Sequence, residues 1–109
     1  MPTTYKVLGQ SNPSATTATT LYTVPASTQA VVSSISVANL TATAATFRIA
    51  VRVAGATLAN SQYIGYDITV GASDSTIITV GLTLNATDVI TVYGSTANLV
   101  FQAFGSEIS

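Results

Sequence analysis

The chain has 109 residues, a length typical of a single domain, and contains neither cysteine nor histidine. These absences exclude disulfide bonds, thiol chemistry and the side chain that most often serves acid–base catalysis and metal binding near neutral pH. Only three residues are basic and the net charge is −1, which excludes the broad cationic surface that binds nucleic acid. So little charge also leaves little repulsion between copies, and we expect a homo-oligomer.

Short runs rich in β-branched and aromatic residues recur along the chain, separated by turn residues. In chain order they predict strands at 4–8, 20–24, 30–39, 46–54, 62–70, 76–82, 89–94 and 99–104. No window shows the 3.6-residue period of an amphipathic helix. Seven or eight strands at this spacing predict an all-β fold, a single antiparallel β-sandwich over residues 1–109. The pattern leaves open whether the topology is jelly-roll or immunoglobulin-like.

Two of these runs alternate in a way that predicts which side faces the core. The predicted core sides consist of Val31, Ile35 and Val37 in the run 30–39, and of Ile64, Tyr66, Ile68 and Val70 in the run 62–70. The opposite sides are rich in threonine and serine, which tolerate water.

Two turns near the C-terminus share one pattern. The segments 72–81 and 86–94 each begin with an aspartate-containing turn, at Asp74 and at Asp88, that leads into β-branched residues. An aspartate in a turn accepts hydrogen bonds from nearby backbone N–H groups. We therefore expect two copies of one structural turn rather than a site.

The first ten residues lack the basic patch and apolar run of a signal peptide. Threonine and serine interrupt every apolar stretch before it reaches the length of a transmembrane helix. We expect neither a secretory signal nor a membrane partner.

The acidic residues Asp67, Asp74, Asp88 and Glu107 are the only candidates for a general base. Glycoside hydrolysis needs two carboxylates that face each other across a cleft, but turn roles explain two of these four. Serine and threonine are abundant, yet a hydroxyl nucleophile needs an activating base. Asp74 and Asp88 could contribute to a calcium site, but neither lies in a loop that spaces several oxygen ligands as calcium-binding loops do. We expect no enzyme, no catalytic residue, no metal site and no cofactor.

Arg48 and Arg52 lie on the same side of the alternating segment 45–55. On an extended strand their stems would be about 13 Å apart. A solvated strand face would explain them, but arginine is also suited to interfaces because its planar fork pairs with carboxylates and carbonyls. We expect an intersubunit contact, with Asp67 and Glu107 as partners across the boundary.

Tyr63 and Tyr93 fall on the sides opposite the predicted core faces. Outward tyrosines on adjacent strands could stack on sugar rings. The alternative is that these rings complete a core or an interface with the hydroxyl at its edge. Glycan stacking is kept as an alternative role for the two residues.

Four segments of the chain resemble small virion structural proteins of tailed bacteriophages, including cyanophages. They are YKVLGQS at 5–11, LYTVPA at 21–26, FRIAVR at 47–52 and FGSEI at 104–108. The similarity runs over nearly the full length, and its motifs are structural rather than catalytic. It implies a β-sandwich subunit made in the host cytoplasm and assembled on the virion, as a trimer.

Three functions are compatible with these observations. The first is a capsid decoration or cement subunit that binds the major capsid protein and stabilises the outside of the head. The second is a tail- or neck-associated fibre or adaptor protein, and the third is a carbohydrate-binding module. In either virion role, the segments 1–12 and 105–109 could serve as extended arms that add to a neighbour's sheet.

Overall fold

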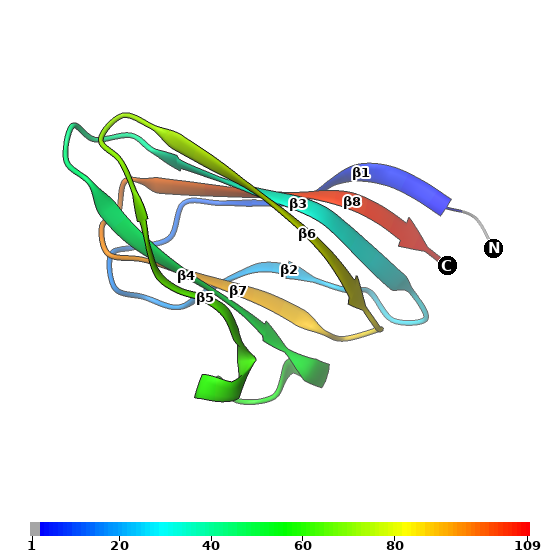
Figure 1. Ribbon diagram of the computed structural model, residues 1–109. Helices are drawn as coiled ribbons and strands as arrows, with labels where there is room; N and C mark the ends of the chain where they lie inside the picture. Colours follow the sequence, from blue (N-terminus) through cyan, green and yellow to red (C-terminus); the bar gives the residue numbers. More distant parts are fainter. Residues whose placement is uncertain (1–2) are drawn as a thin grey trace.

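The computed structural model describes residues 3–109, which form eight β-strands and two short 3-10 helices (Figure 1). The strands are β1 (Thr3–Ser11), β2 (Thr19–Thr23), β3 (Gln29–Asn39), β4 (Ala45–Arg52), β5 (Tyr63–Val70), β6 (Ser75–Leu84), β7 (Val89–Gly94) and β8 (Leu99–Ile108). The helices η1 (Val53–Gly55) and η2 (Asn60–Gln62) lie in the connection between β4 and β5. Each of the eight predicted strands is present, so the all-β prediction is confirmed.

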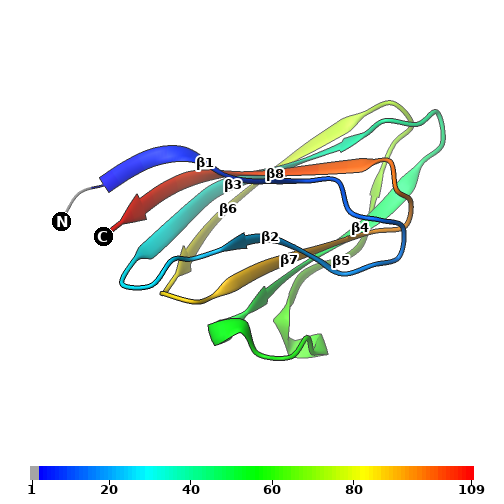
Figure 2. The same cartoon turned by 180° about the vertical axis from the view of Figure 1, so that it is seen from behind.

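The strands form two antiparallel sheets of four that pack face to face, as Figures 1 and 2 show from opposite sides. One sheet has the order β1-β8-β3-β6 and the other the order β2-β7-β4-β5. The first strand therefore pairs with the last, the second with the seventh, the third with the sixth and the fourth with the fifth. This nesting is the jelly-roll arrangement, one of the two topologies that the sequence left open.

The core lies between the two sheets. Phe47 of β4 packs edge-on against Phe101 of β8, with ring centroids 6.0 Å apart. The other large side chains that are fully buried are Val24, Val32, Ile35, Val37, Ile49, Val70, Ile90, Val92 and Leu99. Each such side chain contributes about 1.5–3 kcal/mol by leaving water, so this layer is the main source of stability.

The predicted core side of β3 is confirmed at Ile35 and Val37 and is wrong at Val31. A β-bulge at Ser33, between the pairings of Val32 and Ser34 with β8, inserts one extra residue. Because side chains alternate along a strand, an extra residue moves the pattern to the other face. Val32 is therefore fully buried.

The predicted core side of β5 is confirmed at Val70 only. Ile64, Tyr66 and Ile68 are exposed instead. The register between β4 and β5 shifts twice, and Asp67 has a left-handed backbone with φ of 52°. These irregularities break the strict alternation on which the prediction relied.

The sandwich is closed along the side where the edge strands β1 and β2 meet (Figure 2). A Cβ atom on Gly9 of β1 would overlap the carbonyl oxygen of Leu21 in β2, so the two backbones are in contact there. Only glycine permits such an approach.

The segments considered as arms belong to the sheet in this structure. From Thr3 to Ser11, β1 pairs with β8, and the pairing extends to Ile108 (Figure 2). Met1 and Pro2 of the first segment lie outside the described residues.

The two aspartate turns share one backbone hydrogen bond, and each carboxylate accepts from nearby backbone N–H groups as the sequence predicted, although the groups differ. In each, the aspartate N–H donates to the carbonyl three residues earlier, Gly71 for Asp74 and Asn85 for Asp88. The residue before each aspartate has a positive φ.

Within residues 3–109, no helix has the length and apolar character needed to cross a membrane.

Candidate functional site

All three basic and all four acidic side chains bond to groups of the same molecule. The chain therefore uses its few charges within its own fold. The candidate interface residues Arg48, Arg52, Asp67 and Glu107 are part of this set, and the structure distributes them over three separate places.

Arg48 forms a salt bridge with Asp67, with Nε and Oδ1 2.7 Å apart. Its guanidinium lies between two tyrosine rings, 4.1 Å from the centre of Tyr66 and 4.3 Å from that of Tyr93. Tyr66 in turn meets Tyr63 edge-to-face, with centroids 4.9 Å apart. The bond to Asp67 is the main reason that the pKa of Arg48 is raised. We call these five residues the tyrosine–arginine cluster.

This cluster lies on the outer face of the β2-β7-β4-β5 sheet. Arg48 alternates with the buried Phe47 and Ile49, so it points outward, and it is directly opposite Tyr93 on β7. The structure thus brings both glycan candidates, Tyr63 and Tyr93, to one surface. At an exposed site, a cation–π contact such as those of Arg48 with the two tyrosine rings adds only about 0.5–1 kcal/mol of stability.

Arg52 has a different environment. Its Nε donates to the carbonyl of Ala56 at 2.7 Å and its terminal nitrogen donates to that of Gly55 at 2.9 Å. These carbonyls follow a sharp turn in which Ala54 and Gly55 both have positive φ. Arg52 therefore holds the loop that follows its own strand.

Glu107 lies at the end of the sandwich and bonds to one strand of each sheet. It pairs with Lys6 of β1 at 2.8 Å and accepts a hydrogen bond from the hydroxyl of Tyr22 on β2. These bonds, that of Lys6 first, lower the pKa of Glu107. Burial, and then the bond to Glu107, raises the pKa of Tyr22. Glu107 does not join the arginines.

Asp88 is buried and accepts hydrogen bonds from the N–H groups of Ala54 and Asn85, each at 2.9 Å. Asp74 accepts one from the N–H of Ser75. Both carboxylates therefore organise turns. The part of the chain that the structure describes contains no group of three or more histidine, cysteine, aspartate or glutamate side chains placed to hold a metal ion.

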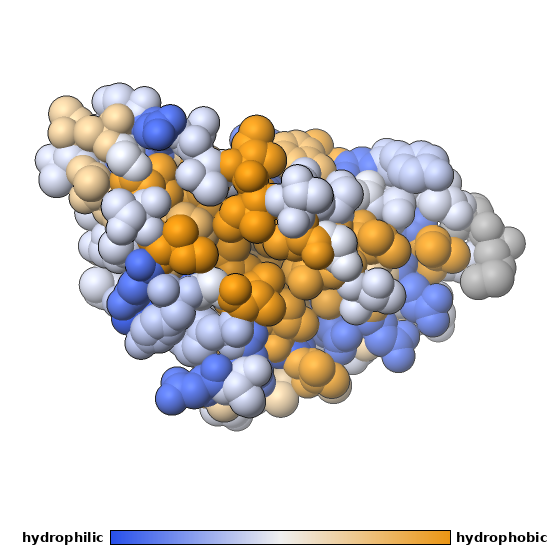
Figure 3. All heavy atoms as spheres, viewed as in Figure 1, coloured by the Kyte–Doolittle hydropathy of each residue, from blue (hydrophilic) through white to orange (hydrophobic). Residues whose placement is uncertain are grey.

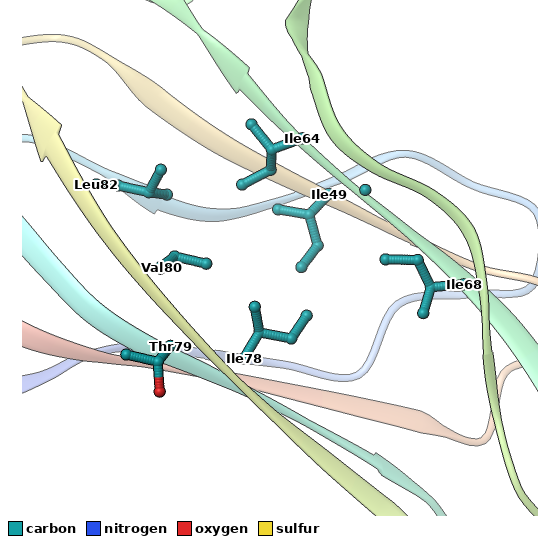
Figure 4. A pocket seen from close by; sticks show the side chains of 8 residues that line it. Ile49, Ile64, Ile68, Ile78, Thr79, Val80 and Leu82 are labelled. Atoms are coloured by element: carbon teal, nitrogen blue, oxygen red, sulfur yellow. The ribbon is translucent and has the colours of Figure 1, made fainter.

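An apolar groove of about 300 Å³ lies between the edge strands β5 and β6, on the side opposite the closed β1–β2 edge. Its apolar lining consists of Ile49, Ile64, Ile68, Ile78, Val80 and Leu82 (Figure 4). Figure 3, seen from the side of Figure 1, shows apolar residues gathered across the middle of this face. We call this feature the β5–β6 groove.

Sequence reasoning missed the β5–β6 groove because it assigned Ile64 and Ile68 to the core. It missed Tyr66 for the same reason. One signal was present in the sequence. The predicted strand at 76–82 contains no charged residue, whereas exposed edge strands usually carry charges, so its edge was a candidate for contact with another protein.

A comparison of the chain with protein-family models and with curated protein sequences finds no match.

Proposed function

We propose that the chain is a non-enzymatic structural subunit of a tailed-phage virion, a capsid decoration or cement protein that binds the outside of the head. The observation that carries this proposal is the β5–β6 groove. Ile64 is 47% exposed there, and no charged side chain lines the groove. An apolar surface of this kind, in a chain with so few charges, favours coverage by another protein.

The use of the acidic residues supports a non-enzymatic role. Asp67 and Glu107 are in salt bridges, and Asp74 and Asp88 hold turns. All four carboxylates therefore have bonding partners within the chain. The fold is compatible with the proposal, since jelly rolls recur in viral capsid and lectin domains, although a fold does not assign a function.

The proposed partners are further copies of the chain and the major capsid protein, and the proposed location is the virion. The test is electron microscopy of particles of the phage that encodes the chain, labelled with gold-conjugated antibody against it. We expect label distributed over the head. Label confined to the tail or neck would replace the decoration role by the fibre or adaptor role, and unlabelled particles would overturn both.

A second candidate function is carbohydrate binding, which the tyrosine–arginine cluster favours. Tyr66 is 52% exposed and lies between Tyr63 and Arg48 on the outer face. Saturable binding to a glycan array, lost in Tyr66→Ala and in Tyr93→Ala, would support this function. Leu40→Ala is the matched control, since Leu40 is exposed and lies outside the cluster.

A further inference from the structure

The four edge strands of the two sheets differ in how they are protected against pairing with another chain. β1 contains Lys6 and a register shift, and β2 has five residues and a register shift. β5 has two register shifts and contains Asp67. Charges, bulges and short length are the usual means by which proteins prevent edge pairing.

β6 lacks this protection over the five residues from Ser75 to Thr79. The strand has ten residues, none of them charged or proline. Its one irregularity follows this stretch, at Val80 and Gly81, of which Gly81 has a positive φ. One side of β6 pairs with β3, and the sheet order leaves its other side free within the described chain. Ile77, on the outer face of this stretch, is 70% exposed.

We propose that a second copy of the chain pairs with this edge, so that the two β6 strands run antiparallel about a two-fold axis centred at Ile77. The two four-stranded sheets would then become one sheet of eight. The proposal concerns only copies of this chain and does not require the virion role, but it assigns to a second copy the β5–β6 groove on which the proposed function rests. It also replaces the trimer that the resemblance implies by a symmetric pair.

The sequence of β6 is self-complementary in this register. On the outer face, Ile77 would oppose Ile77 of the partner copy, and Ser75 would oppose Thr79 in both directions. Apolar β-branched pairs and threonine–serine pairs directly across two strands are stabilising. Because the stretch contains no charge, pairing with itself brings no like charges together.

The same symmetry would cover the β5–β6 groove. The groove is lined mainly by β5 and β6, the edge strands on this side of the sandwich, so the two grooves would face each other across the axis. The exposed Ile64 and Ile68 of β5, together with the partly buried Ile78 of β6, would form one apolar layer between the copies. This gives the exposed isoleucines of β5 a partner without requiring β5 itself to add a strand.

The absence of cysteine from the chain makes the pairing directly testable, since a single introduced cysteine can form a disulfide only with a cysteine introduced in another copy. Ile77→Cys under mild oxidation should give a disulfide-linked dimer, because opposed residues of antiparallel strands are close enough for a disulfide. A mixture of Ser75→Cys and Thr79→Cys should give the crosslinked heterodimer. Thr83→Cys is the matched control, since Thr83 is also exposed on β6 but lies beyond Gly81.

Light scattering after size exclusion measures the same association without crosslinking. The unmodified chain should have twice its monomer mass of 11.1 kDa. Ile77→Lys places two like charges opposite each other and should raise the dissociation constant at least about tenfold. Thr83→Lys adds the same charge outside the pairing stretch and should leave the constant unchanged. Since the interface is apolar, ammonium sulfate should strengthen the dimer.

Three results would overturn the proposal. They are a monomer at all concentrations, a mass of three copies, and equal crosslinking by Ile77→Cys and Thr83→Cys. A monomer whose binding to phage particles is lost in Ile77→Lys and kept in Thr83→Lys would assign the β6 edge to a virion protein instead. Gold labelling of the virion tests the proposed function separately, so the two ideas can fail independently.

Discussion

Tyr22 of β2 and Glu107 of β8 are hydrogen-bonded to each other across the space between the two sheets. Lys6 of β1 binds the other carboxylate oxygen of Glu107. The Glu107 side chain is only 14% exposed, so its charge needs both partners. At this end of the apolar core, the side chains of Tyr22, Lys6 and Glu107 are thus linked by a hydrogen bond and a salt bridge.

This arrangement makes stability depend on pH through Glu107. Its pKa in the folded chain is lower than in the unfolded chain, where it is about 4.3. The resulting stabilisation is fully present above that value and is lost as the pH falls through the lower folded-state pKa. Glu107→Gln lacks this contribution. We expect the difference in free energy of unfolding between the two proteins, measured in urea, to shrink as the pH falls below about 4. A difference independent of pH would contradict this.

Tyr22→Phe removes one of the two partners of Glu107 while retaining the ring in the core. We expect a loss of about 1–2 kcal/mol in the free energy of unfolding at neutral pH, because a poorly solvated carboxylate loses a donor. The matched control is Tyr5→Phe, since Tyr5 is 83% exposed. Equal stability of the two variants would show that the bond contributes little.

The positions of the strands were predictable from the sequence because β-propensity and turn residues act locally. Their faces were less predictable. The bulge at Ser33 depends on how β3 pairs with β8, and the shifts in β5 depend on β4, so no local pattern reveals that Val31 and Tyr66 leave the core.

The same limit applies to the candidate sites. Arg48 and Tyr93 were each identified from the sequence, but their contact arises from the pairing of β4 with β7. Such pairing between strands far apart in the sequence cannot be derived from composition or alternation. All four predicted interface residues, Arg48, Arg52, Asp67 and Glu107, have bonds within the chain, and an additional intersubunit role for them stays a prediction.

The double variant Arg48→Ala/Arg52→Ala separates these two roles. Both arginines have partners within the chain, so we expect a lower temperature of thermal unfolding. Self-association, measured by light scattering across concentration and salt, should be unchanged. Weaker association at an unchanged unfolding temperature would support the intersubunit role.

Gly105 is expected to be among the least replaceable residues of β8. A Cβ atom there would overlap the carbonyl oxygen of Val31 on the neighbouring strand, so alanine would force the two backbones apart. We expect Gly105→Ala to reduce the free energy of unfolding by more than about 3 kcal/mol. Gly81→Ala is the control: Gly81 has φ of 61° and a Cβ atom added there would meet no other atom within 4 Å, so only backbone strain of about 1 kcal/mol applies. Similar losses at both positions would show that the sheet yields easily.

Thr91 of β7 offers a substitution that should stabilise the fold. Its hydroxyl is buried, and within residues 3–109 it has no hydrogen-bond partner. Burying an unpaired hydroxyl costs about 1–3 kcal/mol, and valine has nearly the same shape without that group. We expect Thr91→Val to raise the free energy of unfolding by about 1 kcal/mol in urea titrations. Thr23→Val, at an exposed position of β2, should change it by less than about 0.5 kcal/mol. A loss of stability in Thr91→Val would mean that the hydroxyl is bonded in solution, for which a bridging water is the available partner.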